Sequence, residues 1–185
     1  MLPPMPKRLV ILLFLLSALM AIPVPAAATA EAMWADAEAF ARQLIDCTRS
    51  GGWVTATGGC DPKDGGRVPR RVALRPSAKI SDELSRPYAR RLAQAGYLSH
   101  SLGGSIDQRF ERIGMGGGRG GENIGYTAGR GSVKDAVLHI HRLFQAEWSS
   151  NGPHWQNLVD GRFTRIGIGV WIRDGRTYLV LDFHS

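Results

Sequence analysis

Residues 166–183 read IGIGVWIRDGRTYLVLDF, and this stretch decides the fold class. Aliphatic or aromatic residues occupy every second position on both sides of the pair Asp174-Gly175, which is the pattern of two strands. They are Ile166, Ile168, Val170 and Ile172 before the pair and Leu179, Leu181 and Phe183 after it. Asp-Gly between two such runs favours a tight two-residue turn. The stretch therefore predicts an antiparallel hairpin at the end of the chain.

The segments upstream of the hairpin have the pattern of helices. Apolar residues recur at helical spacing in residues 33–47 and 77–95, and again in a helix that begins at Ser132. Ser105 opens a shorter helix with a capping box completed by Gln108, and Ser132 has Asp135 three residues on in the same arrangement. Pro87 lies inside the second segment, where proline costs about 3 kcal/mol, so we expect a kink or a break there. Helices followed by a terminal hairpin argue for an α+β sandwich and against a doubly wound parallel sheet.

The first thirty residues have the features of an export signal. Lys7 and Arg8 precede an apolar run of 14 residues, Leu9 to Ile22, and an alanine-rich stretch with Ala-x-Ala sites follows. We therefore expect residues 1–30 to be a signal peptide and residues 31–185 to form one domain. The alternative is an uncleaved anchor, but the run is shorter than the roughly 20 residues that span a bilayer. No other apolar stretch approaches that length, so we expect no transmembrane segment in the mature chain.

Export also gives the two cysteines a meaning. In an exported chain, Cys47 and Cys60 enter an oxidising compartment, where they are able to form a disulfide. The alternative is that both remain free, buried thiols. Closing such a loop is worth about 3 kcal/mol in the chain-entropy model. Residues 48–76 hold many glycines and prolines without sustained periodicity, so we expect a long loop whose first half the disulfide would fasten.

Composition limits the function classes without choosing one. The chain has 185 residues, of which 44% are hydrophobic, enough for one domain with a sizeable core. Its formal charge of +7, or +5 once Lys7 and Arg8 leave with the signal peptide, favours acidic partners such as anionic lipid or cell-wall polymer. Aromatic residues make up 8% and no run of Lys and Arg exceeds two, which argues against a nucleic-acid partner. Two cysteines exclude a four-cysteine zinc site.

Three short stretches carry residues with usable chemistry, namely LSH at 98–100, GENI at 121–124 and PHWQNL at 153–158. Each places an imidazole or a carboxylate beside small or amide residues that leave room for a ligand. Taken singly they are unspecific, because a histidine after a helix is usually a capping or surface group and a Glu-Asn pair usually belongs to a turn.

Taken together, and followed by IGIGV at 166–170, these stretches resemble the CAP superfamily of cysteine-rich secretory, antigen 5 and pathogenesis-related proteins, in particular its bacterial extracellular SCP-like members. Their order and rough spacing match from about Leu74 to Ser185. The resemblance implies a three-layer α-β-α sandwich with a central antiparallel sheet. It also implies a cleft lined by two histidines and two acidic residues, where some members bind divalent cations.

The residues that match the family pattern are His100, Glu122 and His154, which are our candidates for catalysis and for metal binding. The second acid of many members stands three residues after a helix tryptophan, and Asn151 occupies that position here. We nominate Glu147 instead, because helical spacing places it on the inward apolar stripe, where a carboxylate must be paired or wet.

Two interpretations of this cluster stay open. Imidazole and carboxylate groups suit zinc or a similar divalent ion, with a position left for water. The alternative is a hydrogen-bonded polar cluster that only positions the cleft walls. In both, Asn123 and Asn157 support the walls of the cleft.

The resemblance favours a secreted, non-enzymatic binding module, with lipid or other envelope ligands among its targets. The alternative is a metal-assisted extracellular hydrolase of peptide or cell-wall material that uses the same cleft. Ser99 adjoins His100, but neighbouring side chains seldom face each other, and neither a G-x-S-x-G nor an H-E-x-x-H motif occurs. A third hypothesis is a wall-associated stability module without a specific ligand.

Overall fold

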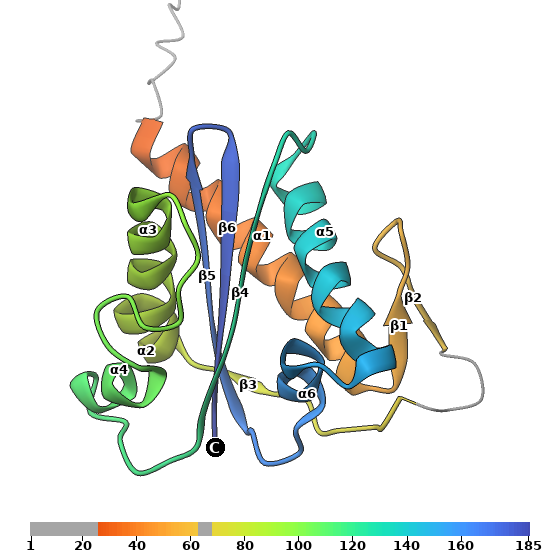
Figure 1. Ribbon diagram of the computed structural model, residues 1–185. Coiled ribbons are helices and arrows are strands. Elements are labelled where there is room, and N and C mark those ends of the chain that lie inside the picture. Colours follow the sequence, from red (N-terminus) through yellow and green to blue (C-terminus); the bar gives the residue numbers. More distant parts are fainter. Residues whose placement is uncertain (1–25, 63–67) are drawn as a thin grey trace, which may run out of the picture.

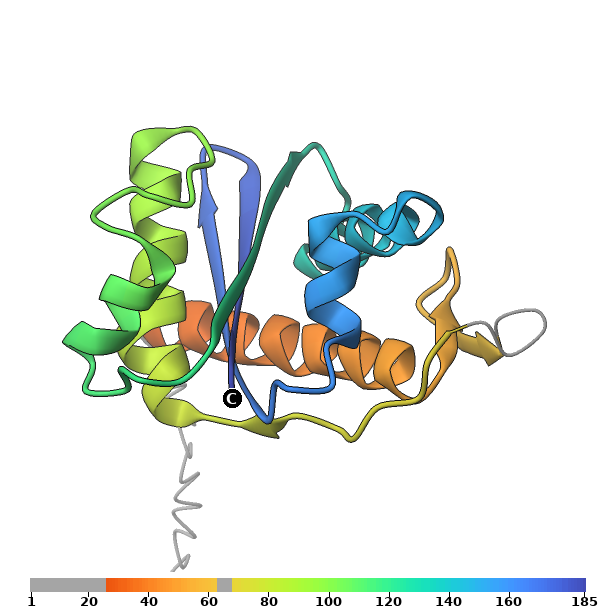
Figure 2. The ribbon, with the colours of Figure 1, turned by 60° about the horizontal axis from the view of Figure 1, so that its bottom comes forward.

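A β-sheet lies between two layers of helices in the computed structural model, which describes residues 26–62 and 68–185 (Figure 1). Helices α1 (Ala26–Arg49) and α5 (Val133–Ala146) cover one face of the sheet, and α3 (Arg86–Ala95) covers the other. The view in Figure 2 shows the same three layers from below. The α+β class and the α-β-α layering predicted from the sequence are confirmed. The predicted signal peptide falls mostly outside the described residues, and its last five positions belong to α1.

The predicted hairpin is formed by β5 (Arg165–Arg173) and β6 (Arg176–His184). Asp174 and Gly175 connect the strands with positive φ angles of 51° and 69°. Positive φ at both turn residues is the type I′ geometry, whose twist matches that of the flanking strands. This explains why Asp-Gly stands between the two runs.

The hairpin is the centre of a four-stranded sheet with the order β3-β5-β6-β4. Strand β4 (Gly120–Ala128) pairs with β6 in antiparallel register over its whole length. The two-residue strand β3 (Arg75–Pro76) joins β5 in parallel at the opposite edge. Antiparallel pairing therefore predominates, as predicted. Strand β4 was not predicted, because glycine and polar residues replace the usual alternation at its start.

Strand β6 is buried on both faces, which makes it the core of the molecule. Its Leu179, Leu181 and Phe183 pack in the cluster formed with α1 and α5. The alternate residues Tyr178 and Val180 pack against α3. A strand covered on both faces has a nearly continuous apolar sequence, as LVLDF shows. The exception in that run is Asp182, whose side chain is fully buried.

The segment around Pro87 is broken as expected, but by an insertion rather than a gap. Helix α2 (Ala78–Ile80) runs into a single π-helical turn, η2 (Ser81–Ser85), and α3 follows with the proline in its first turn. Proline has no N–H to donate to the turn before it, so the regular ladder of helical hydrogen bonds is interrupted there. Gly169 of β5 lets this segment lie on the sheet, since a Cβ there would stand 2.3 Å from the Ser85 carbonyl.

Both predicted capping boxes are present. Ser105 caps α4 (Ile106–Arg112) with the help of Gln108, and Ser132 caps α5 with the help of Asp135. In each box, the serine side chain accepts from the third helical N–H while the third side chain accepts from the serine N–H. These local signals fix where the two helices begin.

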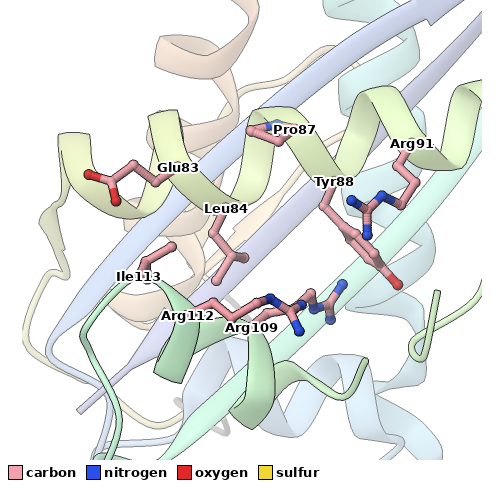
Figure 3. A pocket seen from close by; sticks show the side chains of 8 residues that line it. All are labelled: Glu83, Leu84, Pro87, Tyr88, Arg91, Arg109, Arg112 and Ile113. Carbon is pink, nitrogen blue, oxygen red and sulfur yellow. The ribbon is translucent and has the colours of Figure 1, made fainter. Parts of the chain in front are cut away.

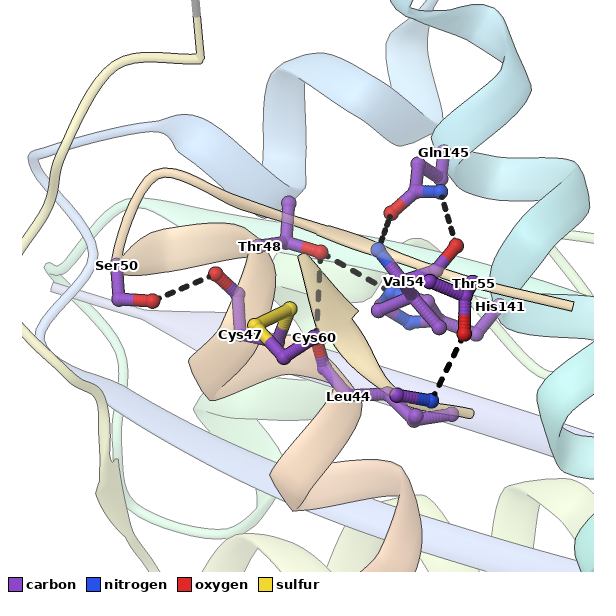
Figure 4. The surroundings of a disulfide bond; sticks show 10 residues. Leu44, Cys47, Thr48, Ser50, Val54, Thr55, Cys60, His141 and Gln145 are labelled. Carbon is purple, nitrogen blue, oxygen red and sulfur yellow. Dashed lines mark hydrogen bonds between the residues drawn. A yellow bond between two sulfur atoms is a disulfide. The ribbon is translucent and has the colours of Figure 1, made fainter. Parts of the chain in front are cut away.

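The predicted disulfide between Cys47 and Cys60 is formed (Figure 4). It fastens the end of α1 to a small hairpin of β1 (Gly52–Val54) and β2 (Cys60–Pro62). The prediction of a long loop over 48–76 was therefore wrong for its first half, and its last two residues form β3. The hairpin is too short to show periodicity, and it is held by the disulfide and by Gln145, whose side chain amide bonds both the N–H and the C=O of Val54.

Arg49 is a buried structural residue that the sequence did not reveal. Its guanidinium donates to four main-chain carbonyl oxygens, those of Val72, Leu158, Asp160 and Phe163. It thereby ties the end of α1 to the connection that enters β5. Across 26–62 and 68–185, no helix combines the length and the hydropathy that crossing a membrane requires.

Candidate functional site

Glu122 is the centre of the first half of the site. Strand β4 places it opposite Asp182 of β6, so both side chains lie on the sheet face that α3 covers. The Glu122 carboxylate is buried and accepts two hydrogen bonds. His100 Nδ1 donates to Oε1 over 2.7 Å, and Arg109 Nη2 donates to Oε2 over 2.6 Å. The guanidinium provides the charge that a buried carboxylate needs.

The loop that carries His100, residues 97–104, is held by side chains from α3 and α4. Gly96 precedes this loop and ends α3 in the left-handed conformation, with a φ of 78°. Four donors then bind four of its main-chain carbonyls: Tyr88 that of Ser99, Arg109 that of His100, Arg91 that of Leu102, and Arg112 that of Gly103. None of these donors was predicted from the sequence, although all four stand on helices that were.

His154 and Glu147 form the second half of the site. Glu147 does not continue the inward stripe of α5, because that helix ends at Ala146 and a 3₁₀ turn, η3 (Glu147–Ser150), follows. Its carboxylate instead accepts from His154 Nδ1 over 2.6 Å and from His154 N over 2.8 Å. The second bond ties Glu147 to the first turn of α6 (Pro153–Val159). Glu147 thus lies one position beyond the helix whose stripe was predicted to include it, and its carboxylate is paired with His154.

Asn123 and Asn157 join the two halves across strand β4. Asn123 Nδ2 donates to the carbonyl oxygen of His154 over 2.9 Å. Asn157 Nδ2 donates to Asn123 Oδ1 over 2.9 Å and to the carbonyl oxygen of Glu122 over 3.1 Å. Both amides therefore hold α6 against the strand, in the supporting position expected for them.

The two histidines meet although they come from opposite helical layers. Their ring centroids are 6.5 Å apart, with an angle of 34° between the ring planes. Phe144 stacks on His154 with a centroid distance of 4.7 Å. The His100 side chain is 59% exposed and that of His154 is 25% exposed, so solvent reaches both rings. The site thus unites groups that are 54 positions apart in the sequence.

The arrangement fits a metal ion only in part. Each carboxylate accepts the Nδ1 hydrogen of its histidine, which fixes the ring and leaves Nε2 for an outside ligand, as in the carboxylate-histidine pairs of metal sites. The carboxylates are already occupied by these bonds. In the part of the chain that the structure describes, no three His, Cys, Asp or Glu side chains are grouped to hold a metal. Two imidazole nitrogens are therefore the donors that fit.

A third carboxylate lies behind Glu122 and was not predicted. Asp182 is fully buried, and its Oδ2 accepts from Ser85 Oγ over 2.7 Å. Burial raises the pKa of Asp182 well above its ordinary value, and the negative charge of Glu122 raises it further. This carboxyl therefore retains its proton far above the pH at which an exposed aspartate loses it.

The hydroxyl of Ser99, which precedes His100 in the sequence, makes its hydrogen bonds with Ser101 and not with the His100 ring. Ser99 Oγ lies 3.3 Å from Ser101 Oγ and accepts from Ser101 N. A serine nucleophile requires a hydrogen bond to its base, and Ser99 does not make one with His100.

Comparison with known proteins gives likenesses of fold. No family model matches the chain, and no curated protein matches it. An outer surface protein from Borrelia burgdorferi is 15% identical, with a TM-score of 0.51 over 62% of this chain and 79% of that one. An extracellular protein containing an SCP domain from Bacillus anthracis is 19% identical, with a TM-score of 0.49 over 62% of this chain. The crystal structure of NaASP2 with Zn²⁺ is 16% identical, with a TM-score of 0.49 over 80% of this chain and 77% of that one.

The chain therefore has a CAP-like fold, as its motifs predicted. It spans only 34% of the Bacillus anthracis protein. At these identities the likeness concerns the fold alone.

Proposed function

We propose that this chain is a secreted binding domain whose two histidines take a divalent cation through their Nε2 atoms. The observation that supports this is the facing pair of imidazoles, 6.5 Å apart, each bonded through Nδ1 to its own carboxylate. Paired rings with free Nε2 atoms are suited to zinc or a similar ion. Such an ion would draw its remaining ligands from water or from the bound partner, so binding is exchangeable.

The residues of the site have separate roles in this proposal. His100 and His154 contact the ion, while Glu122 and Glu147 orient the rings. Arg109 balances the charge of the buried Glu122. When bound, the ion would supply a positive charge that attracts an anionic group of an envelope ligand.

Binding is favoured over hydrolysis because neither Ser99 nor a cysteine is placed as a nucleophile bonded to one of the two histidines. Ser99 is turned toward Ser101, and both cysteines are joined in the disulfide. A metal-assisted hydrolase acting on peptide or cell-wall material remains the alternative, because a histidine-carboxylate pair also serves general base catalysis.

The proposed location rests on three features. The basic, apolar and small-residue order of residues 1–30 is that of an export signal, the disulfide suits an oxidising compartment, and the neighbours in fold include an extracellular and an outer surface protein. We further propose that the basic charge keeps the domain near anionic lipid or cell-wall polymer. Pull-down with anionic vesicles and with wall fragments tests this, since electrostatic attachment weakens as salt rises. Retention that does not depend on salt would contradict it.

Calorimetric titration with zinc chloride tests the cation site. We expect saturable binding by the full chain, loss of binding in His100→Ala and in His154→Ala, and unchanged binding in His139→Ala. His139 is the matched control because it lies on α5 and contacts Arg130, away from the pair. Absence of zinc heat in the unmodified protein would refute the cation site.

The same preparations separate binding from hydrolysis. Peptide and cell-wall substrates are incubated with the protein, with and without a chelator. Turnover by the unmodified protein that is lost in His100→Ala would contradict the binding proposal and support the hydrolase. Zinc binding without turnover would support the binding domain.

A further inference from the structure

A small cavity lies between the η2-α3 segment and α4 (Figure 3). Its volume is about 110 Å³. Three arginines line it, Arg91 from α3 and Arg109 and Arg112 from α4, and we call it the arginine cavity. The ring of Tyr88 also lines it, and Figure 3 shows the Arg109 and Arg112 side chains reaching the space beneath this ring.

Arg109 has unused hydrogen-bonding capacity in this cavity. The residue is 4% exposed, and its Nη2 atom already serves Glu122 and the carbonyl of His100. Its Nε and Nη1 atoms are buried and have no hydrogen-bond acceptor among residues 26–62 and 68–185. Buried donors without a partner are rare in native proteins, and each calls for a water molecule or an ion.

The guanidinium groups around the cavity carry more positive charge than the neighbouring carboxylates balance. Glu122 balances one of the three guanidinium groups. The carboxylate that lines the cavity is Glu83, and it is shared with Lys79, 3.4 Å away. Arg91 and Arg112 each donate to a neutral main-chain carbonyl of the 97–104 loop, which leaves their charge uncompensated. The cavity therefore holds an excess of positive charge.

The size and walls of the cavity restrict what it accepts. A water molecule occupies about 30 Å³ in the liquid, so the volume corresponds to three or four waters or to one small oxyanion. Leu84, Pro87 and Ile113 form apolar walls that offer no competing side-chain acceptor. The planar fork of a guanidinium matches the oxygens of phosphate, sulfate and carboxylate.

We propose that the arginine cavity binds a small oxyanion of the phosphate or sulfate class. The anion accepts from Nε and Nη1 of Arg109 and from the guanidinium groups of Arg91 and Arg112. These same arginines hold the carbonyls of the 97–104 loop, so the bound anion also stiffens the loop that carries His100. The site needs neither the histidine pair nor a cation.

Calorimetric titration of the full chain with sodium phosphate, against sodium chloride at equal ionic strength, tests the proposal. Saturable phosphate heat is expected. Arg112→Gln and Arg91→Gln should each weaken binding about tenfold, since each removes a hydrogen bond to a charged group. Arg90→Gln is the matched control, because Arg90 lies on α3 but stacks over Trp171 outside the cavity. Circular dichroism checks that each variant is folded, and Arg112→Lys retains the charge while losing the fork.

A phosphate group could come from a soluble ester or from a lipid headgroup, and two further binding experiments distinguish these sources. Glycerol phosphate in solution represents a soluble monoester, and phosphatidylcholine vesicles with or without phosphatidic acid represent a lipid headgroup. Binding of either probe that weakens in Arg112→Gln but not in Arg90→Gln supports the site and identifies the source. Hydrogen exchange of the 97–104 loop should slow when phosphate is present. Heat no larger than that of chloride, with no vesicle retention, would mean that water fills the cavity and would overturn the proposal.

Discussion

Asn157 of α6 donates its Nδ2 hydrogen to the main-chain oxygen of Glu122, 3.1 Å away. This bond holds α6, the helix that carries His154, against β4, the strand that carries Glu122. The same amide contacts Asn123, which in turn donates to the His154 carbonyl. The separation of the two imidazoles is therefore set by a chain of amide hydrogen bonds, in addition to apolar packing.

Replacing Asn157 by alanine breaks this chain at its centre. The loss leaves the Glu122 carbonyl and the Asn123 amide oxygen without a donor, so we expect the free energy of unfolding to fall by about 1–3 kcal/mol. Urea unfolding measures the change. Gln156→Ala is the control, because Gln156 is exposed on the same helix. Equal stability of the two variants would show that the amide chain is not structural.

Glu147→Gln tests the second histidine-carboxylate pair. The amide retains the shape of the side chain but provides a weaker acceptor for His154 Nδ1, which now lies 2.6 Å from a carboxylate oxygen. Changes at such supporting acceptors weaken metal binding by about 10–100-fold, and we expect a loss of zinc affinity in that range. Glu111→Gln, an exposed acid on α4, should leave the affinity unchanged. If both variants bind zinc equally well, the orienting role of Glu147 is wrong.

The disulfide should contribute measurably to stability. The double variant Cys47→Ser, Cys60→Ser opens a loop with a sequence separation of 13, for which the chain-entropy model gives about 3 kcal/mol. Chemical unfolding of the oxidised protein, the reduced protein and the double variant measures this contribution. The reduced protein and the variant should agree. A variant as stable as the oxidised protein would mean that the β1-β2 hairpin holds itself.

His141 makes the fold sensitive to mild acid. It is fully buried beside Thr48 Oγ1, at 3.1 Å, and burial lowers its pKa to about 3 (Figure 4). Above pH 6.5 the ring is neutral in both the folded and the unfolded chain, so it has no effect on the pH dependence. Between pH 6.5 and about 3 only the unfolded chain takes up the proton, and stability falls by about 1.4 kcal/mol per pH unit.

His141→Gln should remove this part of the acid sensitivity. The variant loses packing and begins less stable at pH 7, but its stability should fall less steeply from pH 6.5 to 4. Urea unfolding at half-unit steps of pH compares the two slopes. His139→Gln on the same helix is the comparison variant, and it should change the slope less because His139 is only half-buried. Parallel curves for the unmodified protein and His141→Gln would contradict a buried neutral ring.

The fold was predictable wherever the signal is local. The Asp174-Gly175 turn, the capping boxes at Ser105 and Ser132, and the apolar alternation of β5 and β6 each depend on neighbours in sequence. Strand β4 was missed because its first residues are glycines. A Cβ at Gly121 would stand 2.5 Å from the Phe163 ring, and a Cβ at Gly120 would stand 2.9 Å from the Asp107 carboxylate. That requirement exists only in three dimensions.

The site was predictable as a set of residue types, but not as a network. The motifs indicated His100, Glu122 and His154, and the structure brings them together around β4. Arg109 and Asp182, which determine the charge around Glu122, lie on a short helix and in a buried strand where their sequence patterns are ordinary. Contacts between distant segments leave no local signal, so they could not be found from spacing.

Asp182→Asn tests the buried carboxyl behind Glu122. Its pKa is raised in the folded chain, so its contribution to stability is fully present below its ordinary pKa and is lost as pH rises toward the folded value. An amide needs no proton, and its oxygen still accepts from Ser85. We therefore expect the variant to be more stable than the unmodified protein at pH 7–8, by about 0.5–2 kcal/mol as for other favourable single substitutions. The gain should shrink as pH falls toward 4.

Urea unfolding from pH 4 to 8 measures this gain in stability, with the exposed Asp61→Asn as control. A difference that stays constant with pH, or a loss of stability at pH 8, would show that Asp182 is ionised in the folded protein and paired with Arg109.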